Sequence, residues 1–159
     1  MAEMGMKIDM KIADCIRPEH VAIDVEAGSK RELLQILSDR AGGLLGINDK
    51  EISTQIRNRE KLGSTGIGAG IAIPHAPVAG IAAPFGFLAR LEKPIDFDAV
   101  DEQPVDIVCL MLTPPEKGGA CLSLLSRIAR QLRSPEILKR IRSATSTEQL
   151  YSAITEADG

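Results

Sequence analysis

Apolar residues recur every three or four positions between residues 33 and 45, and this spacing predicts an amphipathic helix with one buried face. Ser29 and Glu32 form a capping-box motif before it, in which each side chain satisfies a backbone N–H group that the first turn leaves unpaired. Asn48 and Glu51 repeat the motif and predict a second helix, which ends just before a glycine-rich segment.

Short apolar runs predict four β-strands, at residues 21–24, 70–73, 85–91 and 105–112. The last run is apolar at nearly every position, as expected for a strand that is buried on both faces. We expect a turn at residues 13–16. Further helices are predicted at residues 120–132, 135–143 and from 145 onward. This mixture of elements, without repeats or linkers, predicts one α/β domain over residues 9–156, after a flexible N-terminus at 1–8.

Composition and charge exclude several classes of function. Aromatic residues make up only 3% of the chain, too few for the exposed stacking platform of many nucleic-acid-binding proteins. The net charge of −3 gives no reason to expect a polyanion as the main partner. Between residues 120 and 142, however, six residues are basic and one is acidic. Two interpretations stay open for this segment: a solvated helix face, or a docking patch for an acidic protein surface.

The cysteines and the uncharged centre of the chain bear on its compartment. The three cysteines are widely spaced and form no Cys-x-x-Cys pair, which indicates free thiols in a reducing cytoplasm. The 28 residues between Lys61 and Arg90 carry no charge, but their six glycines and three prolines are incompatible with a continuous membrane-spanning helix. The first ten residues lack the apolar stretch of a secretory signal. We therefore expect a cytoplasmic protein without membrane insertion.

Histidine is the side chain best suited to chemistry near neutral pH, and the chain contains two. His20 lies in a polar turn, where we expect an ordinary surface residue. His75 follows a predicted strand, with Pro74 before it and Ala76-Pro77 after it. A neutral imidazole is a nucleophile when one ring nitrogen is exposed and the other donates to a fixed acceptor. The alternative is a neutral histidine in a glycine-rich turn without a chemical role.

The segment before His75 contains groups that suit a phosphoryl ligand. Residues 62–70 include four glycines, which let backbone N–H groups approach phosphate oxygens. Two hydroxyl groups in the same loop supply further donors. Ser64, Thr65 and Gly66 are therefore candidate phosphate-binding residues.

Helical geometry proposes a source of positive charge for this site. Arg59 falls within about 60° of Ile56 on the second predicted helix at 100° per residue, whereas Arg57 points away. An arginine near an apolar face is costly unless it meets an anion, and a phosphoryl group carries roughly −1.5 to −2 charges. The alternative is an arginine whose charged end reaches water along its stem.

Other motifs do not match. The loop lacks the Lys-Ser/Thr ending of a phosphate-binding P-loop, and it misses the last glycine of the dinucleotide fingerprint. Two scattered histidines do not make a zinc cluster. We therefore expect neither a metal nor a cofactor.

The segment from Arg59 to His75, Arg-Glu-Lys-Leu-Gly-Ser-Thr-Gly-Ile-Gly-Ala-Gly-Ile-Ala-Ile-Pro-His, closely resembles the active-site region of the fructose/mannitol-type enzyme IIA domains of the bacterial phosphotransferase system. It is nearest the nitrogen-regulatory branch. Residues 94–106 and 146–151 are similar too, and the resemblance extends from about Asp9 to Ile154. It implies a single-domain α/β sandwich, a mixed β-sheet with helices packed on both faces.

The resemblance also implies roles for individual residues. His75 would accept a phosphoryl group from a phosphorylated HPr-like protein, and Arg59 would stabilise that group. The chain departs from the family at Ala69, where Asn is frequent, and at Ala76-Pro77, where Gly-Lys is common. Cys121 stands in the place of a second active-site histidine. A thiol is a weaker donor than an imidazole, so we hypothesise that onward transfer to a IIB domain is impaired while acceptance survives.

The leading interpretation is a phosphohistidine carrier and regulator of the nitrogen-type phosphotransferase system, which controls partner proteins by its phosphorylation state. One alternative is the cytoplasmic IIA component of a fructose- or mannitol-type uptake system. Another is a protein-binding module that has lost phosphotransfer. The resemblance names no regulated target, it implies no nucleic acid, and it leaves weak self-association open.

Overall fold

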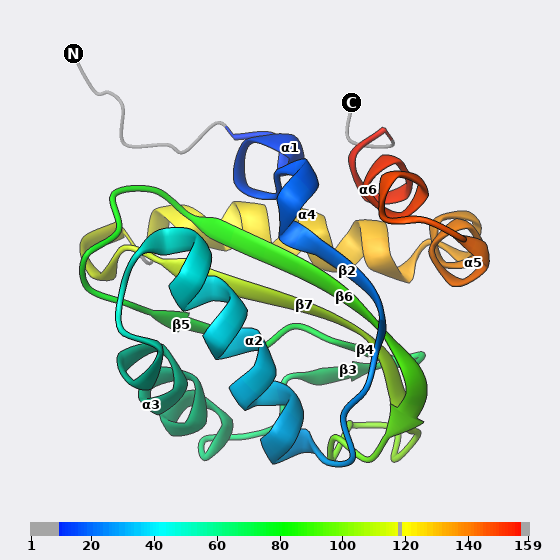
Figure 1. Cartoon of the computed structure of the whole chain (residues 1–159), viewed down its shortest axis with the longest axis horizontal. Coiled ribbons are helices and arrows are strands. Elements are labelled where there is room, and N and C mark those ends of the chain that lie inside the picture. Colours follow the sequence, from blue (N-terminus) through cyan, green and yellow to red (C-terminus); the bar gives the residue numbers. More distant parts are fainter. Residues whose placement is uncertain (1–9, 118, 157–159) are drawn as a thin grey trace.

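The computed structural model describes residues 10–117 and 119–156. A mixed β-sheet forms its centre, with helices on both faces (Figure 1). This arrangement confirms the fold class expected from the sequence. The predicted flexible segment at residues 1–8 lies outside the described residues.

The central strand of the sheet, β7, contains the apolar run at residues 107–112. The strand order of the sheet is β2-β6-β7-β4-β3, and β5 also pairs with β7. The pairs β2–β6, β4–β7 and β5–β7 are parallel, whereas β6–β7 and β3–β4 are antiparallel. The strands are β2 (Val21–Val25), β3 (Gly66–Gly68), β4 (Ile71–Ala72), β5 (His75–Pro77), β6 (Phe85–Ile95) and β7 (Val105–Thr113).

The central strand β7 is buried on both faces, as its sequence predicts. Ile107, Cys109 and Met111 belong to one apolar cluster, and the even-numbered residues from 108 to 112 belong to the other. Successive side chains of a strand point to opposite faces, so residues 107–112, which are all apolar, contribute to two separate cores. All three cysteines are buried as free thiols.

Helices α2 (Lys30–Leu45) and α3 (Asp49–Glu60) cover one face of the sheet (Figure 1). Ser29 caps α2 as predicted, since its hydroxyl accepts the Glu32 N–H at 3.1 Å. The other half of the motif differs, because the Glu32 carboxylate accepts the Gly28 N–H at 2.7 Å. Asn48 caps α3 through the Lys50 N–H.

The opposite face carries four helices, α1 (Ile12–Cys15), α4 (Leu122–Arg133), α5 (Pro135–Ser143) and α6 (Thr147–Thr155). The expected turn at residues 13–16 is therefore a short helix. The predicted helix at 120–132 begins two residues later, after a 3₁₀ turn at Gly119–Cys121. Two other 3₁₀ turns cover Pro18–His20 and Pro115–Lys117. Within the described residues no helix is both long and apolar enough to cross a membrane.

The basic residues of this face divide into two groups. Arg140 pairs with Glu156, Arg142 pairs with Asp106, and Arg127 donates to the Met10 carbonyl. The rest of the basic set is exposed: Arg130, Arg133 and Lys139. Both interpretations of the segment, a solvated face and a docking patch, therefore stay predictions.

Ala69 adopts a left-handed conformation, with φ of 58°, in the turn between β3 and β4. Its N–H donates to the Asp101 carboxylate at 3.0 Å, and its carbonyl accepts from Arg142 at 2.8 Å. The Gln103 N–H, which also donates to this carboxylate, and then the Ala69 N–H lower the pKa of Asp101. The Asp101 carboxylate and the Arg142 guanidinium thus hold Ala69 in a conformation that residues other than Gly, Asn and Asp rarely adopt.

We predict that Ala69→Asn raises the free energy of unfolding by up to about 1 kcal/mol, because asparagine tolerates the left-handed region better than alanine. Urea denaturation measures the change. Ala83→Asn is the matched control, since Ala83 is exposed and does not have a positive φ. Equal effects of the two substitutions would contradict the assignment of strain to Ala69.

Candidate active site

Residues 71–77 run parallel to β7 and pair with it as β4 and β5, with an interruption at Ile73 and Pro74. The pairs Ile71–Ile107 and His75–Met111 have the same register, so the interruption neither adds nor removes a residue. Pro74 has no N–H group to donate, although its carbonyl accepts the Met111 N–H at 2.9 Å. Proline is therefore tolerated at this interruption, since no N–H is needed there. The interruption also leaves the Ile73 carbonyl available to a side chain.

The His75 ring uses that carbonyl. Its Nδ1 lies 2.8 Å from the Ile73 oxygen. A carbonyl only accepts hydrogen bonds, so Nδ1 carries the proton and Nε2 of the neutral ring holds the lone pair. The ring is half-buried. The sequence placed His75 after a strand, and in the structure it begins the short strand β5.

Arg59 lies in the same pocket as His75. The cavity has a volume of about 320 Å³, and its loop side is lined by Arg59, Ser64, Thr65, Ile67, Ile73 and His75. The guanidinium donates from Nη1 to the Gly63 carbonyl at 2.9 Å. No carboxylate of the described residues pairs with it, and no acidic side chain lines the pocket. The pocket therefore has positive charge and unused N–H donors.

The predicted phosphate-binding residues lie in or beside this pocket, but their donors are already engaged. The Ser64 hydroxyl donates to the Phe97 carbonyl at 2.8 Å and accepts the Gly66 N–H at 3.0 Å. Gly66 is also required by packing, because a Cβ there would lie 2.8 Å from the Ala99 Cβ. Contacts of Ser64, Thr65 and Gly66 with phosphate stay a prediction.

Sequence reasoning missed the residue that holds this loop, Glu60. Its side chain is only 7% exposed, and Oε1 lies 2.8 Å from Nζ of Lys30. The same carboxylate accepts the Thr65 N–H at 3.2 Å and the Thr65 hydroxyl. Lys30 Nζ also lies 4.5 Å from the centre of the Phe97 ring. Glu60 falls four residues after the buried Ile56, and this spacing was the available signal.

Helix α4 supplies the other wall of the pocket, which sequence reasoning also missed. Its lining residues are Leu122, Leu125, Ser126 and Ala129. Leu122 is 61% exposed, although it is a large apolar residue. The rim of the pocket thus offers apolar surface to another protein.

Cys121 precedes this wall and is fully buried. Burial raises the pKa of its thiol, which Lys117 partly offsets. No hydrogen bond joins Cys121 to His75 among the described residues, so its role beside the phosphoacceptor stays a prediction. A larger imidazole at this position would require α4 to shift, because protein interiors are close-packed.

His20 has a structural role that the sequence did not indicate. Its ring is half-buried and packs on Phe85, with a centroid distance of 4.6 Å. Its Nδ1 lies 3.2 Å from the Cys15 carbonyl. Among the described residues, no group of three or more potential metal ligands is present.

The chain is similar to known proteins over most of its length. Residues 14–157 match the model of the family described as phosphoenolpyruvate-dependent sugar phosphotransferase system, EIIA 2. The nitrogen regulatory protein of Bradyrhizobium diazoefficiens is 40% identical over 145 residues, which cover 91% of this chain and 95% of that protein. The fructose-specific EIIABC component of Bacillus subtilis is 32% identical over 154 residues, 94% of this chain but 24% of that protein.

Solved structures agree with this result. The crystal structure of nitrogen regulatory protein IIA-Ntr from Neisseria meningitidis superimposes with a TM-score of 0.85 at 30% identity, and it covers 91% of this chain and 99% of that chain. The chain belongs to the enzyme IIA family of the phosphoenolpyruvate-dependent phosphotransferase system. It is a phosphotransferase component, and its relatives favour the nitrogen-regulatory branch over the sugar-uptake alternative.

We predict that Glu60→Gln lowers the free energy of unfolding by roughly 1–3 kcal/mol, because it leaves the Lys30 ammonium with only the exposed Asp98 carboxylate, 3.9 Å away, as a charged partner. Chemical denaturation measures the loss. Glu51→Gln, at an exposed position of the same helix, should change stability by only a few tenths of a kcal/mol. A Glu60→Gln protein as stable as the wild type would show that the Lys30–Glu60–Thr65 network contributes nothing.

Proposed function

We propose that His75 accepts a phosphoryl group from a phosphorylated HPr-like protein, and that the phosphorylation state of His75 controls how the chain binds partner proteins. The observation that carries the proposal is the hydrogen bond from Nδ1 to the Ile73 carbonyl, which leaves the Nε2 lone pair available. The membership in the enzyme IIA family supports the same chemistry.

The transfer step balances without a cofactor. The Nε2 lone pair forms a bond to phosphorus while the phosphorus–nitrogen bond of the donor phosphohistidine breaks, and the donor imidazole leaves with that electron pair. The proton on Nδ1 stays on the ring and donates a hydrogen bond to the Ile73 carbonyl. No general base is needed, because the attacking nitrogen carries no proton.

Arg59 is proposed to stabilise the transferred group. Phosphoryl transfer relies on positioning and on charge stabilisation, and a guanidinium binds phosphate oxygens through two parallel N–H bonds. Its one bond to the Gly63 carbonyl fixes the side chain and leaves other N–H groups for the ligand. The exposed Leu122 at the rim provides apolar surface on which the donor would dock.

The regulatory role is favoured by the higher sequence identity to nitrogen regulatory proteins. This chain is 40% identical to the nitrogen regulatory protein of Bradyrhizobium diazoefficiens over 145 residues, and 32% identical to the fructose-specific component over 154 residues. We propose a nitrogen-regulatory role on this ground. Its target proteins would be recognised by the surface around His75, since that surface changes charge on phosphorylation.

We predict that incubation with phosphoenolpyruvate, enzyme I and an HPr-like donor places acid-labile, alkali-stable phosphate on the chain. His75→Ala should abolish the label, and His20→Ala should retain it, because His20 lies outside the pocket. Label that survives in His75→Ala would contradict the assignment. Absence of label on the wild type would favour the protein-binding module that has lost phosphotransfer.

We predict that Arg59→Gln slows phosphorylation of His75 about 100-fold, the usual cost of removing a group that stabilises developing charge. A rapid-quench time course of labelling measures the rate. Arg17→Gln is the control, because Arg17 is exposed and lies outside the pocket. Equal rates for the two variants would remove Arg59 from the mechanism.

A further inference from the structure

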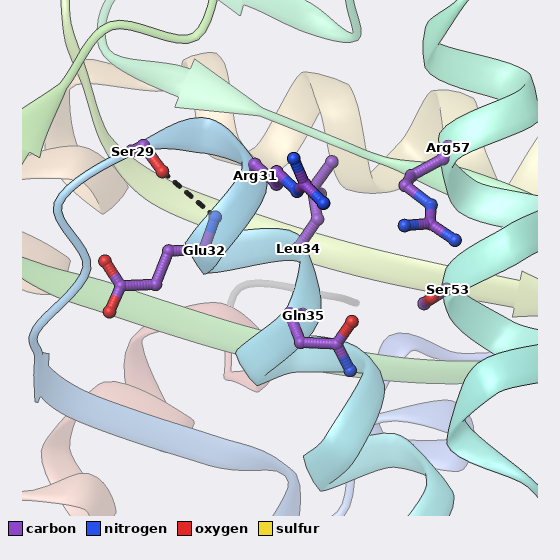
Figure 2. A pocket seen from close by; sticks show the side chains of 7 residues that line it. All are labelled: Ser29, Arg31, Glu32, Leu34, Gln35, Ser53 and Arg57. Atoms are coloured by element: carbon purple, nitrogen blue, oxygen red, sulfur yellow. Dashed lines mark hydrogen bonds between the residues drawn. The ribbon is translucent and has the colours of Figure 1, made fainter.

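A second pocket lies between α2 and α3, and it shares no lining residue with the His75 pocket. Its volume is about 400 Å³. Figure 2 shows the seven residues that line it: Ser29, Arg31, Glu32, Leu34 and Gln35 from the start of α2, and Ser53 and Arg57 from α3. Arg31 and Gln35 are four residues apart, as are Ser53 and Arg57. Each pair therefore follows one face of its helix toward the crevice.

The two arginines lack partners in the described part of the chain. Neither the Arg31 nor the Arg57 guanidinium makes an ion pair or a hydrogen bond with residues 10–117 or 119–156. Both are exposed. In Figure 2 Arg57 extends from α3 toward α2, and the Glu32 carboxylate lies on the far side of α2 from it. Glu32 is engaged with the Gly28 N–H, so it does not neutralise Arg57.

Ser53 supplies an independent observation. It is only 5% exposed, it lines the pocket, and its hydroxyl has no hydrogen-bond partner among the described residues. Buried hydroxyl groups are almost always hydrogen-bonded, because an unmade bond is costly. The unpaired Ser53 hydroxyl can therefore donate a hydrogen bond to a ligand that the arginines attract. Glu60 and Thr65, by contrast, satisfy each other within the chain.

We propose that this crevice binds a small molecule that carries a carboxylate or phosphate group. Arg57 and Arg31 would supply the charge, and the Ser53 hydroxyl would donate to the ligand. The Gln35 amide already donates to the Asp39 carboxylate at 2.8 Å, so it would offer only its second N–H, and Leu34 would contact an apolar part of the ligand. The volume suits a compact metabolite. The site is separate from the proposed phosphoacceptor function, and the failure of either leaves the other standing.

The position of the crevice connects it to the His75 pocket. Arg57 of the crevice and Arg59 of the His75 pocket are two residues apart on α3, and Arg31 follows Lys30, which binds Glu60. A ligand that draws α2 and α3 together therefore acts on the two helices that hold the Glu60–Thr65 contact. Ligand binding in the crevice would therefore change the position of the loop at residues 62–70 beside His75.

The test is a titration of the full chain, followed by amide chemical shifts, with inorganic phosphate in one arm and succinate in the other. We expect saturable changes at residues 29–35 and 53–57. The arm with the lower dissociation constant identifies the preferred group. Arg57→Gln should weaken binding at least tenfold, and Arg130→Gln, an exposed arginine on α4, should leave it unchanged.

Ser53→Ala separates a ligand-binding hydroxyl from a structural one. We expect the variant to be at least as stable as the wild type without ligand, because no hydrogen bond is lost, yet to bind several-fold more weakly. Equal binding by Ser53→Ala and wild type, or equal effects of Arg57→Gln and Arg130→Gln, would overturn the proposal. Binding of a hexaglutamate peptide without binding of either small ion would also overturn it, in favour of an acidic protein segment.

Discussion

The bond between Nδ1 of His75 and the Ile73 carbonyl is the interaction on which the candidate site depends. It requires that the strand be interrupted at Ile73 and Pro74, where only the Pro74 carbonyl still bonds to β7, and that it resume in the same register. Pro74 makes the interruption inexpensive, since a residue without an N–H group leaves no donor unpaired. The gap in the ladder therefore fixes the tautomer of the ring before any ligand arrives.

The loop that faces His75 is held by bonds within the chain rather than left open. Glu60 binds Lys30 and Thr65, and Ser64 binds the backbone of the distant Phe97. A loop fixed in this way keeps Arg59 near the histidine at little entropic cost when a phosphoryl group enters. The buried carboxylate thus serves the site through position, although it does not line the pocket.

Local pattern was enough to predict much of this fold. Strand β7 was predicted to within one residue of its end, and Ser29, Asn48 and Ser146 cap helices near the predicted starts. The sequence also pointed to Arg59 of α3 and His75 of β5, which both line the pocket. It did not point to the α4 wall of the pocket, because contact between segments far apart in the chain depends on the packing of both on one sheet. The burial of Cys121 could not be predicted from local sequence either, since it depends on where α4 begins.

The place of β7 in the sheet has a consequence for synthesis. Its partners β6, β4 and β5 all come before it in the chain, yet they lack their central neighbour until Thr113 has been made. During translation the ribosome releases α2, α3 and the loop at 62–70 with much of their apolar surface uncovered. Non-local pairing of this kind closes loops late and exposes strand edges to other chains in the meantime. Nascent chains that end before residue 113 should therefore depend on chaperones, whereas those that reach the end of α6 can bury both cores.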